Sequence, residues 1–206
     1  MVHDKVGLQP ELHNGDRMSG DEFMRRWEET PELKKAELIE GVVHLALLAS
    51  NPHSAYEAFF GAWLTYYAVA AKQDLWIGSN PTLKLEGSVV QPDVALVRGR
   101  TSLKGGYLNE IPELVVEVCY SSKSYDLGQK LATYHSAGLR DHIAVLTQAR
   151  RVEWRVITGA KCRLLHPTKN GILSSPNFPG LWLDTQALFP LHRQRLFAAI
   201  DRGFNK

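Results

Sequence analysis

The apolar segment 112–119 constrains the fold most, because a glutamate lies in the middle of a run of valines. The segment reads Pro-Glu-Leu-Val-Val-Glu-Val-Cys and predicts a buried strand at the centre of a sheet. Side chains alternate between the two faces of a strand, so Glu117 shares one face with Val115 and Cys119. The opposite face carries Leu114, Val116 and Val118. Burying a carboxylate is costly unless it is paired or binds a metal, which makes Glu117 a candidate functional residue.

A second carboxylate, Asp93, also borders an apolar strand. It follows Gln91-Pro92 and opens the run 94–97, Val-Ala-Leu-Val. At the start of a neighbouring strand, Asp93 could meet Glu117 at a strand edge. Two carboxylates in this arrangement suit a hard divalent cation such as Mg²⁺. Without a metal or a lysine, one of them would have a raised pKa. Taken alone, Asp93 could also simply shape the entry to the strand.

A lysine lies on the helix predicted next, over about residues 125–137, which Gly138 ends. Asp126, Lys130 and Tyr134 follow one another at intervals of four residues and therefore share one helix face. A lysine near a metal-bound water can orient the water or stabilise charge that develops on a phosphate. The simpler alternative is a surface ion pair between Asp126 and Lys130.

The remaining hydrophobic patterns predict a single α/β domain over residues 1–206. Residues 1–18 are polar and predict a loose lead-in, before a short helix that Ser19 opens. Residues 36–48 predict two strands that meet near Gly41, and residues 167–181 predict mostly loop. Further helices are expected at about 53–72 and 190–203, and strands at about 74–77, 82–86, 89–97, 142–146, 152–157 and 161–165. The first of these helices carries an apolar stripe that is expected to be core and not a base-stacking platform, formed by Ala55, Phe59, Trp63, Tyr66 and Tyr67.

The charge balance argues against a large nucleic-acid-binding face. The 206 residues carry 24 Lys and Arg against 22 Asp and Glu, which gives a net charge of +2. Dedicated duplex-binding proteins are usually much more basic, because phosphate contacts dominate their affinity. Any nucleic acid would therefore be held by basic residues around the carboxylates. The candidates are Arg98, Arg100, Lys123 and Lys130.

The cysteines and the apolar runs exclude other classes. Cys119 and Cys162 do not form a zinc-ligand pattern, so a structural zinc is not expected. No apolar run approaches the roughly 20 residues that cross a bilayer. The first residues are polar and lack the apolar segment of a secretory signal. These features predict a cytoplasmic protein without membrane contact.

The order of the motifs resembles the Uma2 family, also called DUF820, of the PD-(D/E)XK restriction-endonuclease-like superfamily. The matching stretches run in the family's order over about residues 20–157. They are 36–41, 51–53, 91–93, 112–118, 121–124, 125–130 with Tyr134, and 137–138. The resemblance implies an α/β (α+β) restriction-endonuclease-like core, with a central mixed β-sheet flanked by helices. It also implies Mg²⁺, or Mn²⁺, held by Asp93 and Glu117.

The resemblance also locates the catalytic lysine at an unusual position. In the superfamily the lysine stands two residues after the glutamate, where this chain has Cys119. Cysteine cannot replace an ammonium group, so the expected substitute is Lys130, which would reach in from the helix. Asp126 is then an accessory residue.

Further candidates come from the other matching stretches. Glu37 is a candidate additional acidic residue of the site, and Glu40 is a weaker one. His53, at a helix start, is either an accessory residue or a helix cap. The family often has Tyr-Trp where this chain has His142-Ile143, a change that affects the support of the site and not its proposed ligands.

The leading functional prediction is therefore a Mg²⁺-dependent endonuclease that hydrolyses phosphodiester bonds in DNA. One alternative is a catalytically inactive nucleic-acid-binding or assembly protein that keeps the nuclease fold. Another is a metal hydrolase that acts on a different phosphoester. Cleavage of both strands would favour a homodimer, because each protomer supplies one site.

Overall fold

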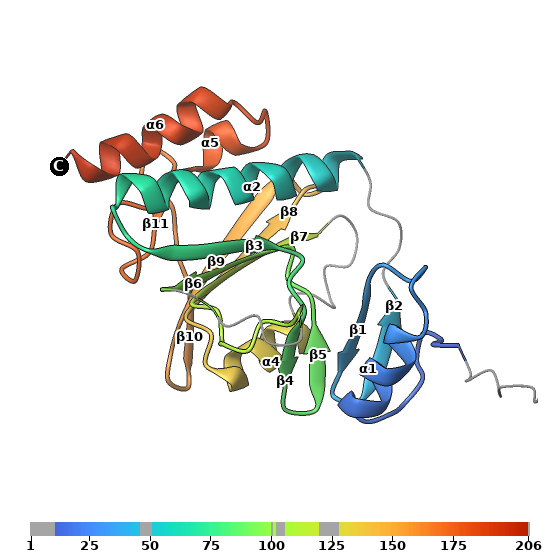
Figure 1. The fold of residues 1–206 in the computed structure, drawn as a ribbon. Coiled ribbons are helices and arrows are strands. Elements are labelled where there is room, and N and C mark those ends of the chain that lie inside the picture. Colours follow the sequence, from blue (N-terminus) through green and yellow to red (C-terminus); the bar gives the residue numbers. More distant parts are fainter. Residues whose placement is uncertain (1–10, 46–50, 100, 102–105, 120–127, 206) are drawn as a thin grey trace, which may run out of the picture.

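A six-stranded mixed sheet forms the centre of the protein, with strand order β10-β9-β8-β7-β6-β3 (Figure 1). The computed structural model describes residues 11–45, 51–99, 101, 106–119 and 128–205. The strands are β3 (Leu75–Ser79), β6 (Val94–Arg98), β7 (Leu114–Cys119), β8 (Asp141–Leu146), β9 (Arg151–Thr158) and β10 (Lys161–Leu164). β7 and β8 are parallel, and the other neighbouring strands are antiparallel. Every residue of β7 and β8 is buried, as expected for central strands.

Helices cover both faces of this sheet. α2 (Asn51–Ala70) and α6 (Arg193–Phe204) lie over one face, and α4 (Gln129–Ala137) lies over the other (Figure 1). The aromatic stripe predicted for α2 is core: Phe59, Trp63 and Tyr67 are buried, and Trp63 meets Trp154 of β9 edge to face. Tyr66 is the exception, since its exposed ring donates a hydrogen bond to Asp201 at 2.6 Å. The predicted mixed sheet flanked by helices is therefore confirmed.

A second sheet, with strand order β2-β1-β5-β4, lies beside the first. Its strands are β1 (Ala36–Ile39), β2 (Val42–Leu45), β4 (Leu83–Leu85) and β5 (Ser88–Val90). β1 and β2 form the predicted hairpin, in which Gly41 has a φ of 77° that favours glycine. α1 (Gly20–Glu28) packs on this sheet, and Ser19 caps it by accepting a hydrogen bond from Glu22 N at 3.3 Å.

The chain crosses between the two sheets at Gln91-Pro92-Asp93. A single strand over about 89–97 was predicted, and that prediction is wrong: β5 ends at Val90 in one sheet, and β6 begins at Val94 in the other. Pro92 has no backbone N–H and cannot donate to a ladder, which favours such a break. Asp93 therefore lies at the junction of the sheets, and its predicted place at the start of a strand is confirmed.

Smaller differences occur in the second half of the chain. Residues 167–181 include a strand, β11 (Ile172–Ser174), which pairs with β12 (Trp182–Asp184) before the short helix α5 (Thr185–Leu188). The last helix begins at Arg193, slightly later than predicted. Both cysteines are free, Cys119 buried and Cys162 exposed. Within the part of the chain that the structure describes, no helix is long and apolar enough to cross a membrane.

Candidate functional site

Charged and polar side chains from six elements gather where the two sheets meet α2 and α4. The contributing residues are Lys35 and Glu37 at β1, His53 and Glu57 in the first turns of α2, Asn80 after β3, Asp93 before β6, Glu117 in β7, and Lys130 and Tyr134 in α4. Four of the charged side chains are almost completely buried. Glu37, Asp93, Glu117 and Lys130 are between 2% and 6% exposed. Charged residues are almost never buried to this degree unless they are paired.

The register of the central sheet places Asp93 and Glu117 at neighbouring positions. β6 and β7 are antiparallel, and Val94 lies opposite Val116. The next pair of positions in this register is Asp93 and Glu117. The Asp93 carboxylate also caps the ladder, because its Oδ2 accepts a hydrogen bond from Val118 N at 2.7 Å. The expectation that Asp93 meets Glu117 at a strand edge therefore agrees with the register.

The Asp93 carboxylate is held ionised by its neighbours. Lys35 Nζ lies 2.6 Å from its Oδ1, and His53 Nε2 lies 3.2 Å from its Oδ2. Burial by itself raises the pKa of Asp93, but the hydrogen bond from His53 and the charges of Lys35, His53 and Lys130 outweigh burial. The pKa of Asp93 is consequently far below its usual range. The same contact with Asp93 raises the pKa of His53.

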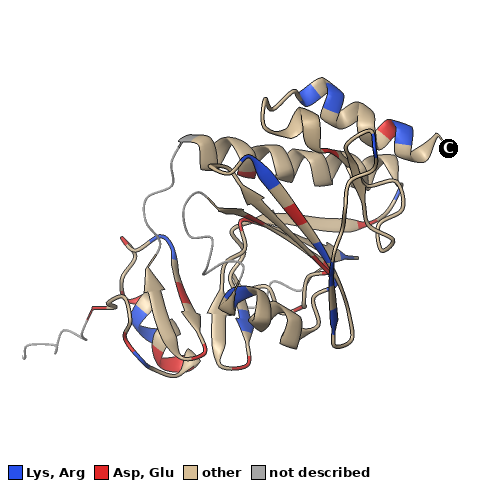
Figure 2. Cartoon of the chain, turned by 180° about the vertical axis from the view of Figure 1, so that it is seen from behind, with Lys and Arg blue, Asp and Glu red and all other residues tan. Residues whose placement is uncertain are grey.

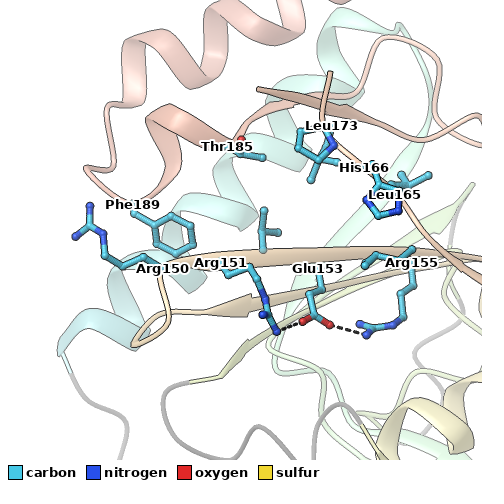
Figure 3. A pocket seen from close by; sticks show the side chains of 12 residues that line it. Arg150, Arg151, Glu153, Arg155, Leu165, His166, Leu173, Thr185 and Phe189 are labelled. Atoms are coloured by element: carbon cyan, nitrogen blue, oxygen red, sulfur yellow. Dashed lines mark hydrogen bonds and ion pairs between the residues drawn. The ribbon is translucent and has the colours of Figure 1, made fainter. Parts of the chain in front are cut away.

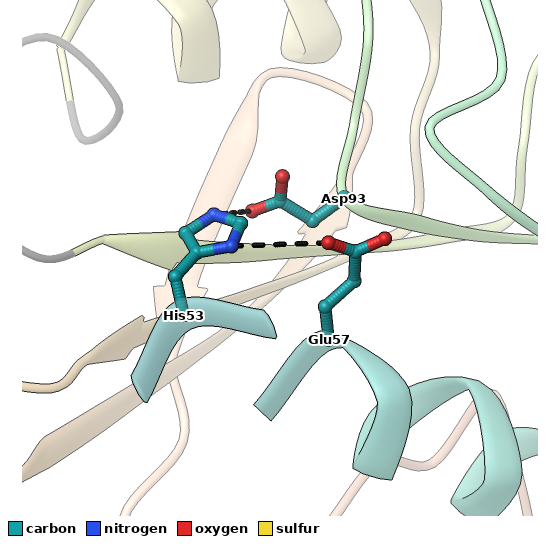
Figure 4. A group of neighbouring side chains, drawn as sticks. All are labelled: His53, Glu57 and Asp93. Carbon is teal, nitrogen blue, oxygen red and sulfur yellow. Dashed lines mark ion pairs between the residues drawn. The ribbon is translucent and has the colours of Figure 1, made fainter. Parts of the chain in front are cut away.

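These groups form a closed ring at the N-terminus of α2. Asn80 links its two halves: its Oδ1 accepts from Lys35 Nζ at 3.1 Å, and its Nδ2 donates to Glu57 Oε1 at 2.5 Å. The ring closes through His53, whose imidazole lies between the carboxylates of Asp93 and Glu57 (Figure 4). His53 Nδ1 is 3.8 Å from Glu57 Oε2. One ligand atom from each of His53, Glu57 and Asp93 lies within 4.8 Å of the others, a grouping that could hold a metal ion.

A second cluster surrounds Glu117 on the α4 side of the sheet. Lys130 Nζ lies 2.9 Å from Glu117 Oε1 and 2.7 Å from Glu37 Oε1, and it also approaches the carbonyl oxygen of Gln91 at 3.5 Å. Tyr134 OH donates to Glu117 Oε1 at 2.8 Å. Burial, and next the charge of Glu117, raise the pKa of Tyr134, so its hydroxyl keeps its proton and remains a donor. One ammonium is thus shared between two buried carboxylates.

Comparison with known proteins identifies the family of this chain. A family model described as "Uma2: Putative restriction endonuclease" matches residues 21–186. The chain belongs to the Uma2 family. Four solved chains share the fold. One is the crystal structure of "a putative nuclease belonging to DUF820" from Anabaena variabilis ATCC 29413, which is 13% identical with a TM-score of 0.63. The match covers 79% of this chain and 96% of that one. No curated protein matches the chain significantly.

The structure of this Uma2 protein brings together most of the residues predicted for the site. Lys130 is buried and contacts Glu117 and Glu37. The alternative, in which Lys130 forms a surface ion pair with Asp126, is therefore wrong. Asp126 itself lies outside the described residues, as does the turn 120–123. Glu40 is exposed at the β1–β2 turn, where its φ is 50°, and it is not part of the cluster.

Cys119 occupies the position where the superfamily has its lysine, two residues after Glu117. Cys119 is buried, and its Sγ lies 3.8 Å from the carbonyl oxygen of Glu117. It packs in a small apolar cluster with Ala144 and Leu146. A side chain of this size neither carries a positive charge nor reaches the carboxylates, whereas Lys130 does both.

Several members of the site were not recognised in the sequence. Lys35 stands two residues before Glu37, and period-two alternation could have placed both on one face. Glu57 follows His53 by one helical turn, a spacing that could also have been noticed. Asn80 gave no signal, because its partners lie 23 and 45 residues away along the chain.

One of the basic residues predicted to lie around the carboxylates, Arg98, lies elsewhere. Arg98 ends β6, at the opposite end of that strand from Asp93, where it donates to the carbonyl oxygen of Asn177 at 2.7 Å and stacks over Phe178. Its expected place beside the carboxylates is therefore wrong, since five strand residues span about 16 Å. Lys123 and Arg100 lie outside the described residues. Figure 2 shows Lys and Arg distributed over several elements with Asp and Glu among them, in agreement with the small net charge.

The donor atoms of the site fit a divalent cation. Oxygens of Glu37, Glu117 and Gln91 already converge on one ammonium group, and oxygens of Asp93 and Asn80 converge on another. Carboxylate and carbonyl oxygens are the preferred ligands of Mg²⁺ and Mn²⁺, and an imidazole extends the set toward transition metals. The chemistry of these donors is thus compatible with a divalent cation, and lysines occupy part of the same oxygen set.

Proposed function

We propose that this Uma2-family protein is a metal-dependent endonuclease that hydrolyses phosphodiester bonds in DNA. The observation that carries the proposal is the burial of Lys130 against Glu117 and Glu37, next to the Asp93 carboxylate. Burying several ionised groups together opposes stability unless each is compensated, so their convergence in one place favours a role in chemistry.

Asp93 and Glu117 are the proposed ligands of Mg²⁺ or Mn²⁺. His53 and Glu57 are further donors on the Asp93 side, because their ligand atoms lie within 4.8 Å of one another and of Asp93. A metal bound there would polarise the scissile phosphate and lower the pKa of a water molecule. The low pKa of Asp93 keeps this ligand ionised without the metal.

The proposed role of Lys130 is to orient the attacking water and to offset the charge that grows on the phosphate. Its stem emerges from α4, and its ammonium is directed at Glu37, Glu117 and the carbonyl oxygen of Gln91. Tyr134 holds Glu117 in place through its hydroxyl. Lys35 holds Asp93 in the same way and adds positive charge where a phosphate would approach.

DNA is the proposed substrate because the family is described as restriction endonucleases, and because a metal bound to the carboxylates would bridge them to a phosphate that they would otherwise repel. Two protomers would supply the two sites needed to cut both strands. The alternative of a protein that binds nucleic acid without cutting it makes the opposite prediction about turnover, so the same experiment separates the two.

The test is the nicking of supercoiled plasmid in Mg²⁺ and in Mn²⁺ by the wild type and by three variants. Asp93→Asn and Glu117→Gln should lose at least about a hundredfold in rate, because each removes a proposed ligand. Glu40→Gln is the matched control: it removes a glutamate from the same hairpin as Glu37 but outside the cluster, and it should nick at the wild-type rate.

Two results would contradict the proposal. One is the absence of metal-dependent nicking on plasmid and on single-stranded DNA by a wild type that titrates with Mn²⁺ in calorimetry. The other is nicking by Glu117→Gln at the wild-type rate, which would assign the activity to other residues or to a contaminant.

A further inference from the structure

An arginine–glutamate–arginine row lies on β9, outside the site described above. Arg151 and Arg155 each donate from a guanidinium NH₂ to a different oxygen of Glu153, the latter at 2.5 Å. Burial raises the pKa of Glu153, but the hydrogen bonds and charges of Arg155 and Arg151 outweigh burial and lower it. The row therefore contains two guanidinium groups held by one ionised carboxylate.

The sheet register places this row on the same face as Glu117. Glu117 lies opposite Ala144 of β8, and Ala144 lies opposite Glu153 of β9. Residues directly opposite one another in adjacent strands project from the same face of a sheet. Glu153 is two strands from Glu117, so the arginines begin about 10 Å from the carboxylate at roughly 4.8 Å per strand.

The arginines also border an open pocket of about 530 Å³ at the edge of β9. β10 pairs with β9 only from Arg155 onward, which leaves the first residues of β9 at the edge of the sheet. Arg150, Arg151 and Arg155 line the pocket, with Glu153 as its acidic residue. Figure 3 shows the row on one side of the strand, and His166, Leu173 and Phe189 on the other. The lining of this pocket therefore carries more positive than negative charge.

The guanidinium groups keep donors for a ligand. Arginine has five N–H donors, and the contacts with Glu153 use few of them. Arg155 Nη1 is buried and has no hydrogen-bond partner among the residues that the structure describes. The side chain of Arg151 is 54% exposed, so it can meet a ligand from solvent. Planar guanidinium groups suit the geometry of phosphate oxygens.

We propose that Arg151 and Arg155 bind a backbone phosphate of the nucleic-acid strand whose reacting phosphate lies at Asp93 and Glu117. This proposal rests on the proposed function and names the surface that holds the substrate. The separation of about 10 Å is short enough for the two phosphates to belong to the same strand. Glu153 orients the two arginines and limits their affinity, since it cancels part of their charge.

The test measures the anisotropy of a labelled short DNA duplex in EDTA, where no metal-dependent cleavage occurs, at several salt concentrations. Arg151→Gln should weaken binding about fivefold and reduce the slope of log affinity against log salt by about one, as expected for one lost phosphate contact. Glu153→Gln should strengthen binding, because it releases both guanidinium groups. A purely structural ion-pair row would instead lose thermal stability in Glu153→Gln without a gain in affinity.

Arg163→Gln is the matched control. Arg163 is exposed on the adjacent β10, opposite Val156, which packs into the core on the α2 face. The variant therefore removes the same charge from the other face, and its affinity for the duplex should equal that of the wild type. Equal loss in Arg151→Gln and Arg163→Gln would overturn the proposal, because it would reflect net charge alone.

Inorganic phosphate separates the two sources of the anion. Weaker binding of the duplex by Arg151→Gln supports the proposal, whereas weaker binding of phosphate with unchanged duplex affinity overturns it in favour of a free anion. Failure of the proposed function has a different signature: duplex binding that depends on Arg151, without cleavage in Mg²⁺ or Mn²⁺. If Arg151→Gln cuts and binds DNA like the wild type, only the present proposal is overturned.

Discussion

The two faces of β7 differ in the side chains that they carry and in the contacts that those side chains make. On one face, Leu114, Val116 and Val118 pack against the aromatic side chains of α2. On the other, Glu117 meets Lys130 and Tyr134 of α4. Both faces are almost fully buried. Burial thus does not distinguish the structural face from the proposed functional face; the chemistry of the buried groups does.

The difference lies in how each face compensates for the loss of water. The apolar face is stabilised by the removal of apolar surface from solvent, at roughly 25 cal/mol for each Å². The α4 face must offset the desolvation of Glu37, Glu117 and Lys130 with ion pairs and hydrogen bonds, and such pairs often contribute little net stability. Substitutions on the first face should therefore affect folding alone, whereas those on the second should depend on pH, metal and charge.

The largest expected effect on stability comes from the apolar face. Trp63 is fully buried and packs against Phe60 and Trp154. Trp63→Ala should reduce the free energy of unfolding by about 3–5 kcal/mol, because it opens a large cavity. Urea denaturation measures this loss. Mn²⁺ affinity of the folded protein should stay unchanged, and a parallel loss of affinity would show that the two faces are not independent.

A pH-dependent effect should belong to the α4 face. His142 is fully buried beside Tyr134, and neither ring nitrogen has a hydrogen-bond partner among the described residues. Burial, with the charges of Arg155 and Lys130, lowers the pKa of His142 from 6.5 to about 3. The unfolded chain then binds the proton more tightly, so stability falls as the pH falls below about 6.5, by up to about 1.4 kcal/mol per pH unit.

His142→Phe should remove this part of the acid sensitivity. Denaturation at several pH values between about 6.5 and 4.5 measures the slope, and this window lies above the range in which Asp93 loses its charge. The variant should show a flatter profile than the wild type. An unchanged slope would mean that His142 is not the neutral, buried group that its surroundings indicate.

A smaller effect compares one hydroxyl on each face. Tyr134 OH donates to the carboxylate of Glu117 at 2.8 Å, whereas Tyr67 OH donates to the carbonyl oxygen of Pro179 at 3.3 Å. Tyr134→Phe should cost about 1.5–3 kcal/mol, since its acceptor is charged, and Tyr67→Phe about 1 kcal/mol. Thermal denaturation of both variants gives the comparison. A larger loss in Tyr67→Phe would contradict the assignment of the tighter polar network to the α4 face.

Local patterns explain why the main features could be predicted from the sequence. Period-two alternation put Glu117 on the face of β7 opposite Val116 and Val118. Four-residue spacing put Lys130 and Tyr134 on one face of α4. The aromatic spacing in α2 predicted its core face. In each case, the signal lies within a single element, where regular geometry fixes the direction of a side chain.

The parts that could not be predicted depend on the arrangement of separate elements. Lys35 pairs with Asp93, 58 positions further along the chain, and only the meeting of the two sheets brings them together. Arg98 looked close to Asp93 in the sequence, but an extended strand separates them. The arginines of β9 share a face with Glu117 only through the register of three strands.

The central claim, that Lys130 on the α4 face is the catalytic lysine, is tested most directly by measuring Mn²⁺ binding and DNA cleavage in Lys130→Gln. The glutamine keeps a hydrogen-bond donor near Glu37 and Glu117 but removes the ammonium charge. Calorimetry should show Mn²⁺ bound at least as tightly as by the wild type, because a competing cation is gone, while single-turnover cleavage falls by at least about a hundredfold. Cleavage at the wild-type rate with bound Mn²⁺ would contradict the claim.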